Sequence, residues 1–356
     1  MALTLKDLAR LAGVHPSTVA RVLNGDPRQR VSAEVRERIV VLARQHGYQP
    51  NRLARALRLK RSHVVGTLIP DISSPFFAAL FRGIEDALAP QDFSVILANS
   101  DDDPVREQRS LVMLRERQVD GLILATALRH DPAIRQLAAE GYPFVLVNRH
   151  TEPLTSNAVV PDDYKGAACA VEHLIALGHR RIAHIAGSDR ISTAYTRRCA
   201  YQETLQRHGL PVDPALIAAG SFREAGGYEA MRALLARPEP PTAVFAVNDL
   251  AAAGALRALS EAGLRVPHDV SVVGFNDIPM VAQTTPPLTT LRLPLHAMGV
   301  AAAERLLAIL SGEEVTEPIV VPVELIRRES TAPVGSRQNA VGRKSASHSL
   351  PDTSVV

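Results

Sequence analysis

The sequence has few cysteines and no long apolar stretch. Cys169 and Cys199 are its only cysteines, and two thiols far apart in the chain fit a reducing compartment, with both side chains expected to be buried. No apolar run reaches the roughly 18–20 residues that a membrane span requires. The opening stretch, MALTLKDLARLAGV, contains no uninterrupted apolar core of the kind a signal peptide carries. We therefore expect a cytoplasmic protein that is not exported.

The common short motifs of enzymes are also missing. The chain contains no G-x-S-x-G, no H-E-x-x-H, no P-loop and no G-x-G-x-x-G. Its scattered histidines His173, His179 and His184 are not spaced with acids as metal ligands are, and we interpret them as surface or helix-end residues. These absences predict a protein that is not an enzyme and that needs neither a metal nor a cofactor.

Charge is distributed unevenly along the 356 residues, which are enough for two or three domains. Residues 1–62 hold thirteen Lys and Arg against four Asp and Glu, a net charge of +9, whereas the rest, with 27 basic and 33 acidic residues, carries −6. This asymmetry indicates a polyanion as partner of the first part only, with a solvated basic surface as the alternative.

From about residue 63 onward, short β-rich runs alternate with amphipathic helical stretches. The runs are VVGTLIP, FSVILAN, DGLILAT, PFVLVN, RIAHIAG, TAVFAVN and DVSVVGFN. Near-continuous apolar strands separated by helices predict an α/β fold of doubly wound parallel sheets. About 270 residues exceed what one such sheet usually holds, so we expect two lobes, with a small ligand bound between them at the carboxyl ends of the strands.

The first fifty residues have the pattern of a helix-turn-helix. A helix from Thr4 to Ala12 is broken by Gly13, a second runs from Pro16 to Leu23, and a third begins after the N-cap Ser32. The apolar positions of the first two helices would pack together and leave the polar residues of the second facing outward. This arrangement suits a recognition helix in the major groove, an ordinary helical hairpin being the alternative.

Individual side chains of this region have the chemistry for contacting DNA. Arg21 is suited to a bidentate bond to guanine, a contact worth about 1–3 kcal/mol of discrimination. Other side chains have hydroxyl or amide groups that could bind the phosphates of DNA, namely Thr4, Ser17, Thr18 and Asn24.

The stretch NRLARALRLKRS, residues 51–62, holds five cations and no acid. Asn51 is a good N-cap, the arginines are spaced by three, and Leu53 and Leu57 share another face of the predicted helix. A helix this short is marginal alone. It would fold where anions and an apolar slot are supplied, as in a DNA minor groove, whereas the alternative is a solvated basic linker.

Several motifs in this order resemble the lactose-repressor/galactose-repressor family of bacterial transcription regulators. They are TLKDLARLAGVHPSTVARVLNG, GYQPNRLARALRLKRS, VVGTLIPDISSPFFAALFRGIEDAL, VEHLIALGHRRIAHIAG, VFAVNDLAAAGALRAL, DVSVVGFNDIP and PPLTTLRLP. The resemblance covers residues 4 to about 330. It implies a homodimer whose headpieces read the half-sites of a pseudo-palindromic DNA operator while paired hinge helices open its centre.

The resemblance also assigns DNA contacts. Pro16, Ser17 and Arg21 match the base-reading positions, and Leu57 matches the minor-groove lever. His15 stands where the family commonly has Ser. Together with the residues suited to phosphate, the predicted DNA-binding set is Thr4, Pro16, Ser17, Thr18, Arg21, Asn24, Asn51, Ala54, Arg55, Leu57 and Arg58.

The core of the family resembles periplasmic sugar-binding proteins, with three strands crossing between lobes. The implied division is a headpiece (1–50), a hinge helix (51–62), a core (63–333) and a disordered tail (334–356). One lobe then comprises 63–161 and 293–322, and the other 162–292 and 323–333. The tail lacks leucine heptads, which predicts a dimer and not a tetramer.

The residues expected to border the cleft suit a polyol, since Asp and Asn bind hydroxyl pairs, Arg bridges oxygens and aromatic rings stack on sugars. They are Asp71, Phe76, Phe77, Asn148, Arg149, Arg197, Phe222, Asn248, Asp249, Asn276 and Asp277. As alternatives, Asp249 and Asp277 would cap helices and Phe77 would belong to the core. Arg197 is the strongest single candidate, and its neighbour Arg198 favours an acidic or phosphorylated sugar.

The sequence thus predicts a DNA-binding transcription regulator, a repressor controlled by a small-molecule effector of the sugar, sugar-acid or nucleoside type. The alternative is a solute-binding protein of a transport system. Neither the identity of the effector nor the choice between inducer and co-repressor can be read from the sequence.

Overall fold

The computed structural model describes residues 3–23, 31–48 and 61–335. The chain divides into two compact parts, Met1–His63 and Val64–Val356. Outside the described residues lie residues 51–60 of the predicted hinge helix, the predicted loop after the second helix and nearly all of the predicted tail. No helix in the described ranges is both long and apolar enough to cross a membrane.

The N-terminal part consists of short helices around a small apolar core, and its described helices are α1 (Leu5–Ala12), α2 (Pro16–Leu23) and α3 (Ala33–Gln45). Thr4 caps α1 in a reciprocal capping box with Asp7, and Gly13 ends it in the left-handed conformation at φ 66°. Ser32 caps α3. The sequence prediction of three helices with these caps is confirmed.

The core of this part comes from one face of each helix. Its buried side chains are Leu8, Ala9, Ala12, Val19, Val22, Ile39 and Ala43. The helices are short, so this shared apolar face stabilises them more than their intrinsic propensity does. Packing of this face fixes which side of α2 points outward.

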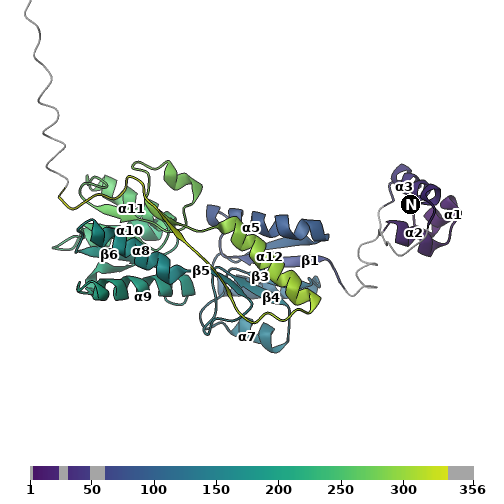
Figure 1. The fold of residues 1–356 in the computed structure, drawn as a ribbon, viewed down its shortest axis with the longest axis horizontal. Helices are drawn as coiled ribbons and strands as arrows, with labels where there is room; N and C mark the ends of the chain where they lie inside the picture. The colour runs from purple at the N-terminus through teal and green to yellow at the C-terminus, as the bar shows by residue number, and fades with distance from the viewer. Residues whose placement is uncertain (1–2, 24–30, 49–60, 336–356) are drawn as a thin grey trace, which may run out of the picture. The chain divides into compact units, whose positions relative to one another are not determined.

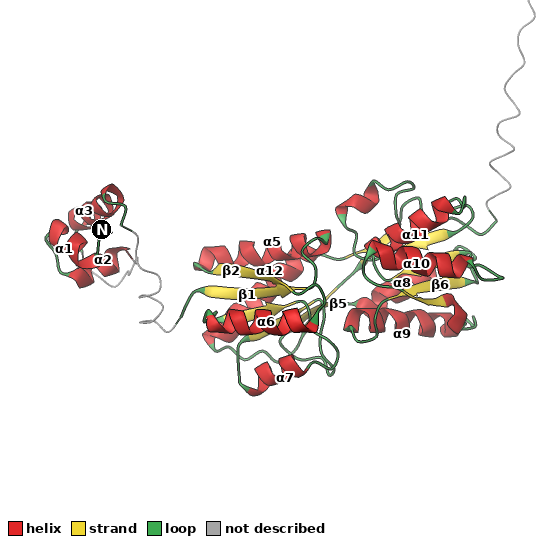
Figure 2. Ribbon diagram, turned by 180° about the vertical axis from the view of Figure 1, so that it is seen from behind, coloured by secondary structure: helices red, strands yellow, loops and turns green. Residues whose placement is uncertain are grey.

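The first lobe of the C-terminal part is built on a six-stranded parallel sheet in the order β11-β5-β4-β3-β1-β2. Its strands are β1 (Val64–Ile69), β2 (Ser94–Asn99), β3 (Gly121–Leu124), β4 (Phe144–Val147), β5 (Ala158–Pro161) and β11 (Ile319–Val321). The helices of this lobe are α5 (Pro75–Leu88), η1 (Ala89–Gln91), α6 (Pro104–Glu116), α7 (Pro132–Ala139) and α12 (Leu295–Ser311). Helices α5 and α12 lie on one face of the sheet, and α6 and α7 on the other (Figure 2).

Helices α5 and α12 pack unusually closely because glycines face each other. A Cβ atom at Gly83 would lie 2.1 Å from the carbonyl oxygen of His296, and one at Gly299 would lie 2.1 Å from that of Leu80. Neither position therefore accepts a side chain without the helices moving apart. Through α12, a segment from near the C-terminus completes a lobe that begins at residue 64.

The second lobe has a four-stranded parallel sheet in the order β7-β6-β8-β9. Its strands are β6 (Ile182–Ala186), β7 (Ile217–Ala219), β8 (Ala243–Ala246) and β9 (Ser271–Val273). Its helical segments are α8 (Asp163–Ala176), α9 (Ser192–Arg207), η2 (Pro214–Leu216), α10 (Glu224–Leu235), α11 (Asp249–Glu261) and η3 (Pro279–Ala282). Helices α8 and α9 pack together, as do α10 and α11.

Three segments connect the lobes (Figure 1). The chain passes into the second lobe after β5, returns between β10 (Thr290–Arg292) and α12, and passes over again between β11 and β12 (Glu324–Ile326). Strands β10 and β12 pair antiparallel. The carboxyl ends of β1, β4, β8 and β9 therefore meet where the lobes face each other.

The α/β class with parallel sheets is confirmed, and each of the seven predicted apolar runs contains a strand. Two readings of single residues were wrong. Cys169 and Cys199 are only half-buried, because each lies on a helix with one exposed side. His184 is fully buried in the middle of β6, so it is neither a surface nor a helix-end residue. His173 lies in the last turn of α8 and His179 just after its end, as the helix-end prediction expected, although His179 is buried.

Candidate functional site

The exposed side of α2 carries the residues predicted to contact DNA. Val19 and Val22 are buried in the headpiece core, which leaves Arg21 exposed and Pro16, Ser17 and Thr18 half-buried at the start of the helix. The polar side chains thus gather at the N-terminal end and outer face of α2. This is the arrangement that helix-turn-helix proteins present to the major groove.

His15 acts as a cap of α2. Its Nδ1 atom accepts a hydrogen bond from the backbone N–H of Ser17 at 3.2 Å and lies 2.8 Å from the Ser17 hydroxyl. The Thr4 hydroxyl is likewise engaged, since it donates to Asp7 Oδ2 at 2.6 Å. Both hydroxyl groups are therefore oriented by neighbours within the headpiece. The remaining predicted DNA contacts lie outside the described residues: Asn24, Asn51, Ala54, Arg55, Leu57 and Arg58.

A pocket lies between the two lobes of the core, at the carboxyl ends of their strands. Its cavity is about 50 Å³, room for a few water molecules at roughly 10–15 Å³ each. It is lined by Pro70, Asp71, Ser74, Phe76, Phe77, Asp102, Asn148, Arg149, Thr193, Arg197, Phe222, Arg223, Asn248, Leu250 and Asn276. This position is where open α/β sheets bind ligands.

Three buried oxygen atoms of the pocket wall have no hydrogen-bond partner within the described structure. They are Oδ1 of Asn148, Oδ1 of Asn276 and Oγ1 of Thr193. Asn148 follows β4 at φ 66° and Asn276 follows β9 at φ 123°, a left-handed region that Asn tolerates better than most residues. A buried polar atom without a partner costs free energy, so these atoms are set to bind a polar ligand.

Arg197 is held rigidly in the second lobe. It is 2% exposed, its Nε donates to Asp163 Oδ1 at 2.8 Å, and its Nη1 donates to the Val247 carbonyl at 2.6 Å. The guanidinium also lies 3.6 Å from the centre of the Phe275 ring. Asp163 is buried too, so the charge of Arg197 is balanced inside the protein.

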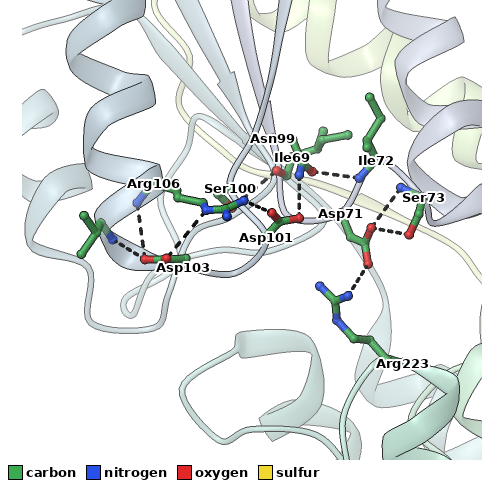
Figure 3. Close-up of polar contacts among 11 residues, drawn as sticks. Ile69, Asp71, Ile72, Ser73, Asn99, Ser100, Asp101, Asp103, Arg106 and Arg223 are labelled. Carbon is green, nitrogen blue, oxygen red and sulfur yellow. Dashed lines mark hydrogen bonds and ion pairs between the residues drawn. The ribbon is translucent and has the colours of Figure 1, made fainter.

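The other two arginines of the pocket are also paired with carboxylates. Arg149 Nη1 donates to Asp102 Oδ1 at 2.7 Å, and its side chain is 5% exposed. Arg223, from the second lobe, lies 3.3 Å from Asp71 Oδ2 in the first lobe. Figure 3 shows Asp71 between Arg223 and Ser73, whose N–H and O–H both donate to its other oxygen. The pocket wall therefore holds arginines without an unbalanced positive charge.

Two predicted contacts, Asp249 and Asp277, do not line the pocket. Asp249 is fully buried and accepts hydrogen bonds from the Thr290 hydroxyl at 2.5 Å and the Ile278 N–H at 2.8 Å. Burial raises its pKa to about 6. Asp277 pairs with Arg292 and Arg328. The Asp249 carboxylate joins the start of α11 to β10 and to the loop after β9, and the Asp277 carboxylate joins that loop to the crossing segments. Neither serves as the helix cap that was the alternative, because Asn248 caps α11 and η3 has no side-chain cap.

The other predicted contacts do line the pocket, and Phe76 and Phe77 belong both to its wall and to the core. Pocket residues that the sequence reading missed are Pro70, Ser74, Asp102, Thr193, Arg223 and Leu250. Arg223 directly follows the predicted Phe222, so its position beside the cleft was available from the sequence. Thr193 and Asp102 had no such signal, because they come from the start of α9 and from the loop after β2.

Family comparisons cover most of the chain. Residues 62–329 match the family of periplasmic binding proteins and the sugar binding domain of the LacI family, and residues 4–51 match the bacterial regulatory proteins of the lacI family. The chain belongs to the LacI family of bacterial regulatory proteins.

Relatives of this LacI-family protein agree with that assignment. It is 33% identical to the HTH-type transcriptional regulator DegA of Bacillus subtilis over 94% of the chain and 100% of the relative. It is 36% identical to the ribose operon repressor of Escherichia coli over 85% of the chain and 92% of the relative. Its family relatives are regulators, so this LacI-family protein is a transcription regulator and not an enzyme.

The fold of this LacI-family protein also matches a solved complex. The structure of the lac repressor dimer bound to operator and the anti-inducer ONPF has a TM-score of 0.84 and 30% sequence identity, covering 93% of the chain and all of that structure. The matched residues come from both the headpiece and the core.

Proposed function

We propose that this regulator is a cytoplasmic, homodimeric repressor of a pseudo-palindromic operator, and that a neutral sugar or similar polyol bound in the pocket controls its affinity for DNA. The headpiece supplies the DNA contacts through α2, with Arg21 reading a base and the hinge segment entering the minor groove. Support comes from the relatives, which include a ribose operon repressor and a lac repressor dimer on its operator.

The observation that carries the choice of effector is the set of unpartnered oxygen atoms in the pocket wall. The amide oxygens of Asn148 and Asn276 can only accept hydrogen bonds, and the Thr193 hydroxyl can donate or accept. Hydroxyl groups of a polyol would donate to both amides and exchange a bond with Thr193. Phe76, Phe77 and Phe222 offer apolar faces to the C–H surface of a sugar ring.

The charges of the pocket favour a neutral ligand over an acidic one. Arg197, Arg149 and Arg223 are each paired with a carboxylate, so a ligand acid would have to displace a partner or share its cation. Arg198, which favoured an acidic sugar in the sequence, does not line the pocket and binds both oxygens of Asp189. A sugar acid or phosphate is therefore the weaker alternative.

Control of DNA binding follows from where the binding groups lie. Asn148 comes from the first lobe, whereas Asn276 and Thr193 come from the second. A ligand bonded to both sides stabilises one angle between the lobes and disfavours others. Effector binding and operator affinity are then coupled through that angle, and the coupling has the same size in both directions.

The same proposal includes the domain limits, with the headpiece at 1–50, the hinge at 51–62, the core at 63–333 and the tail at 334–356. A solute-binding protein of a transport system would need the core alone. The headpiece match at residues 4–51 favours the regulator.

The test is a thermal-shift screen of the purified full chain against neutral sugars, sugar acids, sugar phosphates and nucleosides. Each hit is then titrated by calorimetry and added to an operator-binding assay. We expect a neutral sugar to stabilise the protein and change its operator affinity, with a weaker or no response to the matching acid and phosphate. A response to acids or phosphates alone would contradict the neutral pocket.

A matched pair of variants in α9 makes the test specific. Thr193→Val removes the pocket hydroxyl, while Thr204→Val makes the same change at a buried position near the other end of the helix. We expect Thr193→Val to weaken effector binding about tenfold, the effect of losing one hydrogen bond to the ligand. Thr204→Val should bind as the unmodified protein does. Equal affinities for all three proteins would place the effector elsewhere.

A further inference from the structure

A second cavity lies between the lobes beside the effector pocket. Its volume is about 260 Å³, larger than the pocket itself. We call it the side chamber and define it by its lining residues: Asp102, Pro104, Glu107, Thr126, Leu128, Ser188, Arg190, Ile191, Gly220, Ser221, Phe222 and Arg223. Residues up to Leu128 belong to the first lobe, and the others to the second.

The side chamber adjoins the effector pocket. Asp102, Phe222 and Arg223 line both cavities, so a single layer of side chains separates them. Two of these three are held by ion pairs, Asp102 with Arg149 and Arg223 with Asp71. Arg223 is about half exposed, and its side chain reaches Asp71 (Figure 3), so of these three side chains it is the one that a ligand can displace at the smallest cost. A ligand longer than one sugar ring can therefore extend from the pocket past this layer of side chains.

Hydrogen-bonding groups line the side chamber from both lobes. The Thr126 hydroxyl donates to Glu107 Oε1 at 2.5 Å, and Thr126 is itself 2% exposed. On the opposite wall, the hydroxyl oxygens of Ser188 and Ser221 accept from the backbone N–H groups of Arg190 and Arg223. In these bonds the two serine hydroxyls act as acceptors, so each can still donate a hydrogen bond to a ligand.

Glu107 is an unusual group for an interlobe cavity. Burial raises its pKa to about 7; the hydrogen bond from Thr126 and the charge of Arg149 lower the pKa, while the charges of Asp131 and Asp102 raise it further. Near neutral pH the carboxyl group is therefore protonated in a large fraction of molecules and can donate as well as accept. A carboxyl group that can both donate and accept suits a neutral ligand with hydroxyl groups better than an ionic ligand.

We propose that the side chamber binds the second unit of a two-unit neutral glycoside, whose first unit occupies the pocket between Asn148 and Asn276. The apolar side chains of Leu128, Ile191 and Phe222 give this unit a surface to lie on, while Glu107, Ser188 and Ser221 bind its hydroxyls. The inference rests on the proposed function and names the effector class more narrowly.

The experiment compares one-unit and two-unit neutral sugars on the full chain by thermal shift and calorimetry. The probes are glucose, galactose and ribose against maltose, cellobiose, lactose, trehalose and sucrose. We expect at least one disaccharide to bind about tenfold or more tightly than its component monosaccharides, the effect of one additional good polar contact or apolar ring contact. The same disaccharide should be the compound that changes operator affinity.

Variants that fill the side chamber test where the second unit lies. Ser188 is exposed at the chamber wall, so Ser188→Phe blocks the space without burying a mismatched side chain, and Ser221→Phe does so from a neighbouring loop. Each should lower disaccharide affinity about tenfold and change monosaccharide affinity by less than about twofold. Ser311→Phe, at the end of α12 away from both cavities, is the matched control.

The outcomes separate this inference from the proposed function. If only monosaccharides bind, or if both filling variants bind the disaccharide as the control does, the side chamber is not part of the effector site although the regulator is still controlled by a sugar. If no neutral sugar binds, both the proposed effector class and the proposed two-unit glycoside are contradicted.

Discussion

Arg223 of the second lobe and Asp71 of the first form an ion pair of 3.3 Å across the mouth of the effector pocket. Ser73 fixes the carboxylate by donating to its other oxygen through both N–H and O–H. The pair stabilises the arrangement in which the lobes are close together. It is partly exposed, so its contribution is modest, about 0.2–1 kcal/mol.

Removing this ion pair should weaken effector binding. We expect Asp71→Asn and Arg223→Gln each to reduce affinity by up to about fivefold, and the double variant to be no worse than either single one. Calorimetric titration of the four proteins at low salt gives the coupling energy, which should shrink at high salt. Additive losses in the double variant would mean that the two side chains act on the ligand separately.

His184 should make the core sensitive to acid. It is fully buried between the rings of Tyr201 and Phe245, and its Nδ1–H donates to the Phe245 carbonyl. Burial lowers its pKa to about 4. Because the folded pKa lies below the unfolded value of about 6.5, the stabilisation is complete above pH 6.5 and is lost as the pH falls toward 4. The loss is on the order of 3 kcal/mol.

Denaturant unfolding between pH 4.5 and 7 measures this effect. His184→Phe should flatten the pH dependence of the unfolding free energy, whereas His208→Gln, an exposed change at the end of α9, should leave it as steep as in the unmodified chain. If the unfolding free energy of His184→Phe depended on pH as steeply as that of the unmodified chain, groups other than His184 would cause the acid sensitivity.

The glycine contact between α5 and α12 should not tolerate a methyl group. Gly83→Ala and Gly299→Ala each place a Cβ about 2.1 Å from a backbone oxygen of the other helix. Overpacking of this kind costs about 1–3 kcal/mol, so the melting temperature should fall by several degrees. Ala79→Ser, on the exposed side of α5, is the control and should have little effect. Melting temperatures equal to that of the control would show that the helices separate easily.

Base recognition should depend on Arg21. We expect Arg21→Ala to reduce discrimination at one base pair of each half-site by about 1–3 kcal/mol, measured by binding to a set of operators with single substitutions. Arg10→Ala removes a cation that is exposed and paired with Asp7 on α1, and should weaken all operators by a similar small factor. If Arg21→Ala also weakened binding to all operators by a similar factor, Arg21 would contact phosphate and not a base.

We predict a dimer and not a tetramer, because residues 336–356 contain no leucine heptads that would join two dimers. We expect light scattering to give a mass of twice 38.4 kDa for the chain. A chain that lacks residues 336–356 should still have the mass of a dimer. A stable tetramer that becomes a dimer on deletion would mean that the tail joins dimers by another route.

Much of the fold could be predicted from the sequence because its signals are local. Thr4 with Asp7, Ser32 and Gly13 are read directly as caps and stops, and the apolar runs mark the central strands. Strands such as β5, β7 and β12 were not predicted, because no longer apolar run surrounds them, unlike the equally short β3, β4, β8 and β9. Their pairing depends on distant strands.

The pocket was predicted where a polar residue follows a strand, as at Asn148 and Asn276. The same rule was misleading for Asp249 and Asp277, since consecutive residues after a strand point in different directions. Asn248 faces the pocket while Asp249 turns into the core. The ion pairs that neutralise Arg149, Arg197 and Arg223 join residues 34 to 152 positions apart, so the neutral character of the pocket was not readable from the sequence.

The path of the chain has a consequence for how the protein is made. The sheet of the first lobe is completed by β11, and one face of it is covered by α12, yet both are translated after every strand of the second lobe's sheet. When residue 292 has been added, every strand of the second lobe's sheet has been synthesised, but α12, which packs against α5, has not. During synthesis, the sheet of the second lobe is therefore able to form first. The first lobe, although most of its strands are made earlier, is completed only when α12 and β11 have been synthesised.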